Sequence, residues 1–154
     1  MCSSDLKNIG DQFEKIRFDI VTSQRDTNKL KRDIVEMRER MFEKHKTAKD
    51  YFNLKQDRGG IIDIEFIVQY FVLAFSTAHK ELTHNIGNIG LLNLFSEKGL
   101  IEASIAKHLI DAYRTYRSLQ HQLGLEAKLD GNVNYLQVGS HPNEVREIWE
   151  QTFN

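Results

Sequence analysis

The chain has 154 residues, a formal net charge of -1, 40% hydrophobic and 28% charged residues, and one cysteine, Cys2. This length suits a single domain with a buried core, and the near-neutral charge gives no electrostatic reason to expect nucleic acid or an anionic membrane as a partner. One cysteine excludes an internal disulfide and favours a reducing compartment. The longest apolar run carries polar side chains and is shorter than a bilayer span. We expect one cytoplasmic domain over residues 1–154.

Apolar residues spaced three and four apart predict a series of amphipathic helices. The first covers residues 6–20, and the second covers residues 30–41 after an expected N-cap at Asp26. We expect these two helices to form an antiparallel hairpin. The chain has a single proline, Pro142, which favours a mostly helical protein because proline disrupts helix interiors.

The helical period stops over residues 44–58. Residues 51–55 are expected to be extended, with Phe52 and Leu54 on one side and the alternate residues on the other. The next helix follows Gly59-Gly60 and is expected to run from Ile61 to near His79. Its only polar side chains up to Phe75 are Asp63, Glu65 and Gln69. A helix that is apolar nearly all round belongs at the centre of a domain.

Three more helices are predicted downstream. A short one uses the apolar residues of 86–95 and ends at Lys98-Gly99, and a long one carries apolar residues on one face from Ile105 to Leu123. Residues 124–140 show no sustained period and are expected to form a loop. The last helix is expected to begin at Pro142 or Asn143. The predicted fold is therefore all-α, a bundle of about six helices around the helix that follows Gly59-Gly60.

Gly59-Gly60 at the start of a helix allows two interpretations. The first amides of a helix are free donors at the positive end of its dipole, so the turn could cradle a phosphate, with Lys55 and Arg58 adding charge nearby. Alternatively, the two glycines simply turn the chain into the helix, and the dipeptide by itself favours this second interpretation.

Asp63 and Glu65 are the acidic residues of the central helix. Residues two apart on a helix diverge by about 200°, so the two carboxylates are not expected to chelate one ion as a pair. Asp63 could act in function or only favour the helix N-terminus, and Glu65 could act in function or be a buried partner of an arginine or lysine. No histidine pair has metal-site spacing, and no Walker or Rossmann motif is present.

Residues 55–69 closely resemble the Lys-x-x-x-Gly-Gly-Ile-x-Asp-Ile-Glu-Phe signature of glutamine synthetase adenylyltransferase. The resemblance extends upstream to residues 33–41 and downstream to Leu82-Thr83, Asn88 and residues 112–117. It implies a bifunctional enzyme with two similar halves, each a nucleotidyltransferase domain followed by a helical domain. One half attaches AMP to a tyrosine of glutamine synthetase, and the other removes it by phosphorolysis.

The family's Gly-Ser and Asp-x-Asp motif has no counterpart in this chain. The resemblance therefore implies an excised helical domain whose magnesium and ATP chemistry depends on an upstream nucleotidyltransferase domain, and which is inactive and without cofactor alone. The tryptophan-containing last helix resembles the C-terminus of the adenylylating half, so we expect the domain to come from that half.

In this interpretation the domain completes the nucleotide cleft, and the matched residues expected to face it are Lys55, Arg58, Gly59, Gly60, Asp63 and Glu65. Lys55 would contact phosphate, the glycines would permit close backbone approach, and Glu65 would orient a basic or metal-bound group. Ile62 stands where the signature often has arginine or threonine, which leaves a contact at that position open. The alternative is a docking module for glutamine synthetase or the PII signal protein, with no direct nucleotide role. A helical scaffold unrelated to nucleotide transfer is the third possibility.

Overall fold

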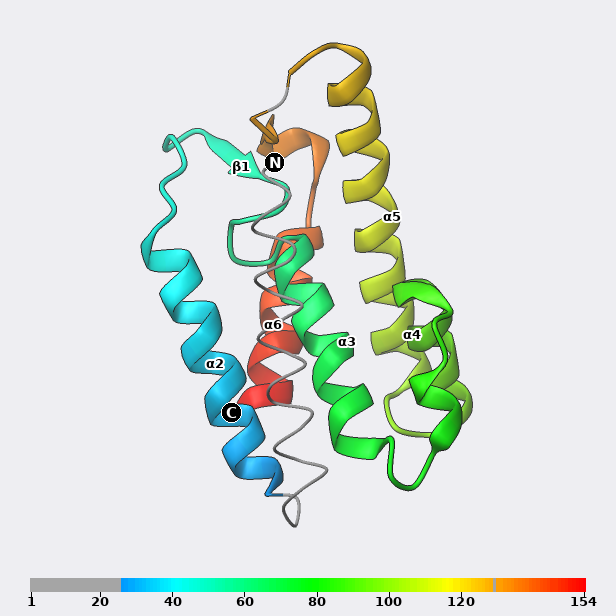
Figure 1. The fold of residues 1–154 in the computed structure, drawn as a ribbon. Coiled ribbons are helices and arrows are strands. Elements are labelled where there is room, and N and C mark those ends of the chain that lie inside the picture. Colours follow the sequence, from blue (N-terminus) through cyan, green and yellow to red (C-terminus); the bar gives the residue numbers. More distant parts are fainter. Residues whose placement is uncertain (1–25, 129) are drawn as a thin grey trace.

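A computed structural model describes residues 26–128 and 130–154, so the helix predicted over residues 6–20 and its hairpin lie outside the described residues. The elements in chain order are α2 (Thr27–Glu43), β1 (Tyr51–Asn53), α3 (Ile61–Phe75), the 3₁₀ helix η1 (Lys80–Thr83), α4 (Gly87–Glu97), α5 (Ala103–Leu125), β2 (Asn132–Asn134), the 3₁₀ helix η2 (Tyr135–Gln137) and α6 (His141–Phe153). The α-helices form a bundle with α3 at its centre (Figure 1). The predicted all-α class is confirmed.

The central position of α3 follows from its composition. The helix packs against α2, α4, α5 and α6, and its side chains Ile62, Ile64 and Ile67 have no exposed surface. It ends at Phe75 rather than near His79, because the segment that follows, with Thr77 and Ala78 exposed, offers no apolar face to bury.

Helix boundaries agree with the signals that predicted them. The Asp26 carboxylate accepts hydrogen bonds from the backbone N–H groups of Asn28 (3.0 Å) and Lys29 (3.1 Å), which makes it the N-cap of α2. Gly99 has a φ of 70°, the left-handed conformation that ends many helices. The last helix begins at His141 with Pro142 in its first turn, one residue before the predicted start.

The prediction of a continuous loop over residues 124–140 is wrong. This stretch holds the end of α5, the strand β2 and the 3₁₀ helix η2. β1 and β2 pair antiparallel, with Phe52 opposite Val133. Three-residue strands are too short to produce a periodic pattern, so their partner across the sheet was not detectable from the sequence.

The extended segment predicted over residues 51–55 is confirmed only for Tyr51–Asn53, because residues 54–56 form a turn; Phe52 and Leu54 are both completely buried. The opposite side is less exposed than simple alternation predicts. Tyr51 is exposed, whereas Asn53 and Lys55 are buried, and the Asn53 side chain accepts hydrogen bonds from the Lys55 and Gln56 amides of the turn that follows β1.

Candidate functional site

The Gly59-Gly60 turn is shaped by close packing against the protein's own backbone. Gly59 has a φ of 85°, and a Cβ atom there would lie 2.4 Å from the carbonyl oxygen of Pro142 at the start of α6. A Cβ atom on Gly60 would lie 2.7 Å from the carbonyl oxygen of Leu54. Both distances are shorter than real Cβ contacts, so only glycine fits at either position. The glycines were expected to permit close approach of the backbone to a ligand, and in the structure the groups that approach them closely are neighbouring segments of the protein itself.

The amides at the start of α3 are already bonded within the protein. Gly60 N–H donates to the carbonyl of Asp57 (2.9 Å), Ile61 N–H to that of Leu54 (2.8 Å) and Ile62 N–H to that of Lys55 (3.2 Å). A phosphate needs such donors free. The phosphate-cradle interpretation of this turn is therefore wrong, and the glycines turn the chain into the helix.

Asp63 lies inside the protein, with 1% of its surface exposed. One carboxylate oxygen accepts from Arg38 Nε at 2.5 Å, and the other accepts from the Gly59 amide at 2.6 Å. Arg38 also donates through Nη2 to the carbonyls of Gln56 (2.7 Å) and Asp57 (3.2 Å). A buried charge with this set of partners joins α2 and α3 to the turn. The placement favours a structural role for Asp63 over the predicted position on an open cleft.

Two residues from other helices also hold the turn. The Tyr116 hydroxyl of α5 donates to the Gly59 carbonyl at 2.7 Å, and burial raises the pKa of this phenol. Arg146 of α6 donates through Nε to the Arg58 carbonyl at 3.0 Å. The signature turn is thus bonded to α2, α3, α5 and α6.

Sequence reasoning assigned no such role to Arg38, Tyr116 or Arg146. A signal existed for two of them: Arg38 and Tyr116 both fall in the flanking segments of the family resemblance, residues 33–41 and 112–117. Nothing in the local pattern of the last helix distinguishes Arg146 from an ordinary surface arginine.

Arg58 points toward α2. The centre of its guanidinium group lies 4.9 Å from the ring centroid of Phe42, a cation–π distance. Burial, followed by the nearby charge of Arg38, lowers the pKa of Arg58. Its side chain does not line the cavity that contains Lys55.

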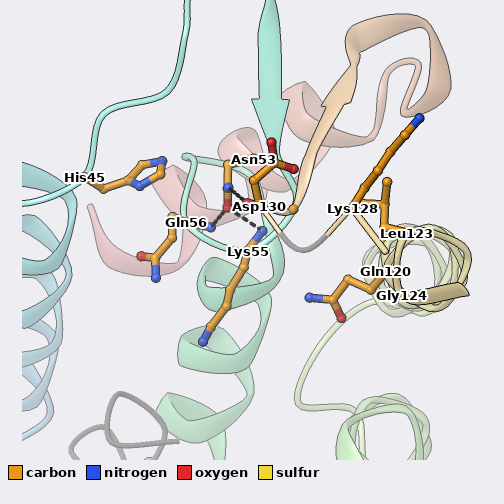
Figure 2. A pocket seen from close by; sticks show the side chains of 10 residues that line it. His45, Asn53, Lys55, Gln56, Gln120, Leu123, Gly124, Lys128 and Asp130 are labelled. Carbon is orange, nitrogen blue, oxygen red and sulfur yellow. Dashed lines mark hydrogen bonds between the residues drawn. The ribbon is translucent and has the colours of Figure 1, made fainter. Parts of the chain in front are cut away.

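Lys55 lines a cavity of about 420 Å³. Figure 2 shows Lys55, from the segment after β1, on one side of this cavity and Gln120 of α5 on the other. The remaining lining residues are His45, Asn53, Gln56, Leu123, Gly124, Lys128, Asp130 and Gly131. Small-molecule sites typically occupy about 300–1,000 Å³, so the volume of this cavity lies within the range of such sites.

Asn53 fixes the wall of this cavity. Its side-chain oxygen accepts from the amides of Lys55 (3.2 Å) and Gln56 (2.8 Å), and its amide nitrogen donates to the Asp130 carbonyl and to the Asn132 side chain, both at 2.9 Å. The side chain is fully used, so its role is to position the Lys55 backbone. These dashed bonds to the Lys55 and Gln56 amides are visible in Figure 2.

A second series of hydrogen bonds supports the rim of this cavity near His45. The His45 ring Nε2 lies 2.5 Å from the Thr47 hydroxyl, and that hydroxyl donates to Asp57 at 2.9 Å. The other carboxylate oxygen of Asp57 accepts from the backbone N–H of Asn53 at 2.8 Å. The linker between α2 and β1 is therefore connected to the same loop that carries Lys55.

Glu65 is half-buried on α3. Burial raises the pKa of its carboxyl group, while the positive charges of Lys55 and Arg117 act in the opposite direction. Of the six predicted site residues, the structure thus gathers Gly59, Gly60 and Asp63 in the bonded turn. Lys55 and Glu65 lie outside this turn, and the positive charge of Lys55 acts on the pKa of Glu65.

Magnesium was expected in the parent enzyme. Across residues 26–128 and 130–154, no group of three or more histidine, cysteine, aspartate or glutamate side chains is arranged to hold a metal ion. The described residues therefore do not fit a magnesium site of their own. In the same part of the chain, no helix has both the length and the apolar character needed to cross a bilayer.

A protein-family model described as GlnD PII-uridylyltransferase matches residues 28–132. The chain is also similar to proteins named bifunctional glutamine synthetase adenylyltransferase/adenylyl-removing enzyme. The relative from Burkholderia pseudomallei is 43% identical over 94% of this chain, that from Nitrosomonas europaea 48% over 96%, and that from Neisseria meningitidis serogroup A 40% over 92%. These matches cover 16%, 17% and 15% of the relatives, so the chain spans about one-sixth of their length.

Proposed function

Since the chain belongs to the family described as GlnD PII-uridylyltransferase and corresponds to a domain of bifunctional glutamine synthetase adenylyltransferases, we propose that it is the helical accessory domain that completes the nucleotide cleft of such an enzyme. The parent enzyme would act in the cytoplasm and transfer AMP from ATP to a tyrosine of glutamine synthetase. The domain would follow the nucleotidyltransferase domain of the C-terminal, adenylylating half.

The target is inferred from the relatives. The family description names a uridylyltransferase acting on PII, whereas relatives 40–48% identical to this chain are named for adenylyl transfer and glutamine synthetase. Identity at this level over nearly the whole chain favours the adenylylating enzyme over the uridylylating one.

The position of Lys55 is the observation that supports a nucleotide role. Its backbone is fixed by the Asn53 side chain, and its side chain lines a cavity of about 420 Å³, within the range of small-molecule sites. A lysine ammonium group binds phosphate as a point charge. We assign phosphate contact to Lys55 and orientation of a neighbouring basic group to Glu65. Gly59, Gly60 and Asp63 act indirectly by fixing the turn that carries Lys55.

Magnesium and the catalytic aspartates belong, in this proposal, to the upstream nucleotidyltransferase domain, since the described residues of this chain do not fit a metal site. When bound there, the metal would neutralise developing phosphate charge. The helical domain's own part is to position the nucleotide from the opposite side of the cleft.

The test uses the full-length enzyme with Lys55→Gln and, separately, Glu65→Gln. Loss of a charge-assisted hydrogen bond worth about 1.5–3 kcal/mol should lower kcat/KM for ATP by about 10- to 100-fold in the Lys55 variant. Lys49→Gln, at an exposed lysine of the α2–β1 linker, is the matched control and should leave AMP transfer unchanged. Wild-type kinetics in both the Lys55 and the Glu65 variants would refute a nucleotide role.

A second candidate is favoured by the bonded turn itself. Because Gly59, Gly60 and Asp63 serve packing within the chain, the signature could be architectural and the domain could dock glutamine synthetase or the PII signal protein. In that case the Lys55→Gln enzyme would keep its ATP kinetics, and binding of one of those two proteins would require this domain. Binding measured with the full-length enzyme and each purified partner separates the two candidates.

A further inference from the structure

Large apolar side chains are exposed at one end of the bundle. Among the described residues, Leu136 is 90% exposed, Leu125 76%, Tyr51 49% and Tyr135 44%, and we call these four the end-face patch. They belong to β1, to the C-terminal end of α5 and to η2, which follows β2 directly. Figure 1 shows β1 and the C-terminal end of α5 at the same end of the molecule.

The small sheet at this end cannot readily accept another strand. The amides of β2 that flank Val133 are occupied by side chains: Asn132 N–H donates to Asp130 Oδ1 at 3.1 Å, and Asn134 N–H donates to Gln137 Oε1 at 3.2 Å. On β1, the Tyr51 amide donates to the Ala48 carbonyl. A partner at this face would therefore bind through side chains rather than by strand addition.

The patch adjoins the cavity that contains Lys55. A smaller cavity of about 200 Å³ lies between α5 and the sheet, and Tyr51 is part of its lining. Leu123 and Lys128 line both this cavity and the larger one in Figure 2. A protein surface covering the end-face patch would thus lie beside the mouth of the larger cavity.

We propose that the end-face patch is the surface on which the preceding domain of the same polypeptide docks. The inference rests on the proposed function. The relatives align with 92–96% of this chain, yet the chain spans only about one-sixth of their length, so in an enzyme of that length the domain would have neighbouring domains to pack against. The core of an interface is more apolar than the rest of the surface and enriched in aromatic residues, which fits two exposed tyrosines beside two exposed leucines. Docking here also places the neighbour against the Lys55 cavity, as a two-domain cleft requires.

The test measures side-chain accessibility in the full-length enzyme. Leu136→Cys and, as a matched control, Ile86→Cys each introduce a thiol at an exposed apolar position, and Ile86 (48% exposed) precedes α4, outside the patch. The rate of alkylation at each position is followed by mass spectrometry of the corresponding peptide. We expect the thiol at position 136 to react about tenfold more slowly than the thiol at position 86, independently of protein concentration.

Equal rates at the two positions would overturn the proposal. Slow labelling at position 136 that appears only at high protein concentration would also overturn it, because a second copy would then cover the patch. The readout does not depend on AMP transfer. Protection at position 136 together with wild-type kinetics of Lys55→Gln would retain the docking surface and reject the nucleotide role. Equal labelling at positions 136 and 86 together with weakened ATP kinetics of Lys55→Gln would reject the docking surface and retain the nucleotide role.

Discussion

Arg38 on α2 and Asp63 on α3 form an ion pair, with Nε and Oδ1 2.5 Å apart and side chains that are 0% and 2% exposed. The pair lies between two helices and the Gly59 amide, so it fixes the signature turn from inside the bundle. The family signature around Gly59-Gly60 therefore serves primarily to hold the helices together. In the proposed function, its contribution to chemistry depends on Lys55, a buried residue that lines the neighbouring cavity.

Breaking this pair on one side should strongly destabilise the protein. Arg38→Met or Asp63→Asn leaves a buried charge without its partner, at a cost of about 3–5 kcal/mol in free energy of unfolding. Urea denaturation of this chain measures the change in free energy of unfolding. The double variant Arg38→Met/Asp63→Leu should lose less than the sum of the two single replacements, because neither charge is then stranded. Single variants within about 0.5 kcal/mol of wild type would contradict the structural role.

Gly59→Ala should also destabilise the protein, by about 2–4 kcal/mol. The substitution combines a left-handed backbone with a Cβ atom against the Pro142 carbonyl. Gly124, in the last turn of α5, is the control, since a Cβ atom there meets nothing within 4 Å. Gly124→Ala should leave stability unchanged or raise it by up to about 1 kcal/mol. Equal midpoints of thermal unfolding for the two variants would rule out the close packing at Gly59.

Tyr116→Phe should cost about 1–3 kcal/mol in free energy of unfolding. It removes one hydroxyl from a completely buried ring and leaves the Gly59 carbonyl without that donor. Tyr135→Phe, at a ring that is 44% exposed, should fall within about 0.5 kcal/mol of wild type. The two variants differ from wild type by the same atom, so denaturant midpoints compare them directly. A neutral Tyr116→Phe variant would show that the bond to Gly59 contributes nothing.

Glu65→Gln should stabilise the protein at neutral pH and not at acidic pH. Burial raises the pKa of Glu65 above the ordinary value of 4.5, so the folded state holds this proton more tightly than the unfolded state. Stability is therefore lost as pH rises from the unfolded pKa through the folded pKa. The glutamine variant avoids this loss, and its advantage should vanish below about pH 4, where the carboxyl is protonated in both states.

Glu144→Gln is the control of opposite sign. Hydrogen bonding from Ser140, together with the nearby His108, lowers the pKa of Glu144. The ionised Glu144 carboxylate therefore stabilises the folded state above the pKa of the unfolded state, and this stabilisation is lost as pH falls through the pKa of the folded state. The Glu144→Gln variant should accordingly be less stable than wild type near pH 7. Unfolding midpoints measured from pH 4 to pH 8 test both variants. A Glu65→Gln effect that does not change over this range would argue against burial as its cause.

The sequence by itself determined where the helices form and which of them lies at the centre of the bundle. Asp26, Gly99 and Pro142 mark boundaries through local chemistry, and the apolar character of α3 places it inside because every face must be covered. The family was also readable, because the signature around Gly59-Gly60 is a contiguous string of residues.

Tertiary structure alone decided which signature residues serve packing and which face a cavity. Asp63 meets Arg38, and Gly59 meets Tyr116 and Pro142, across 25, 57 and 83 positions of the chain, and no periodic pattern encodes such pairings. The same holds for β2, whose three residues carry too little pattern to reveal their partner strand. Local propensity acts over a few residues, whereas burial and hydrogen bonding between distant segments are fixed only when the helices pack together.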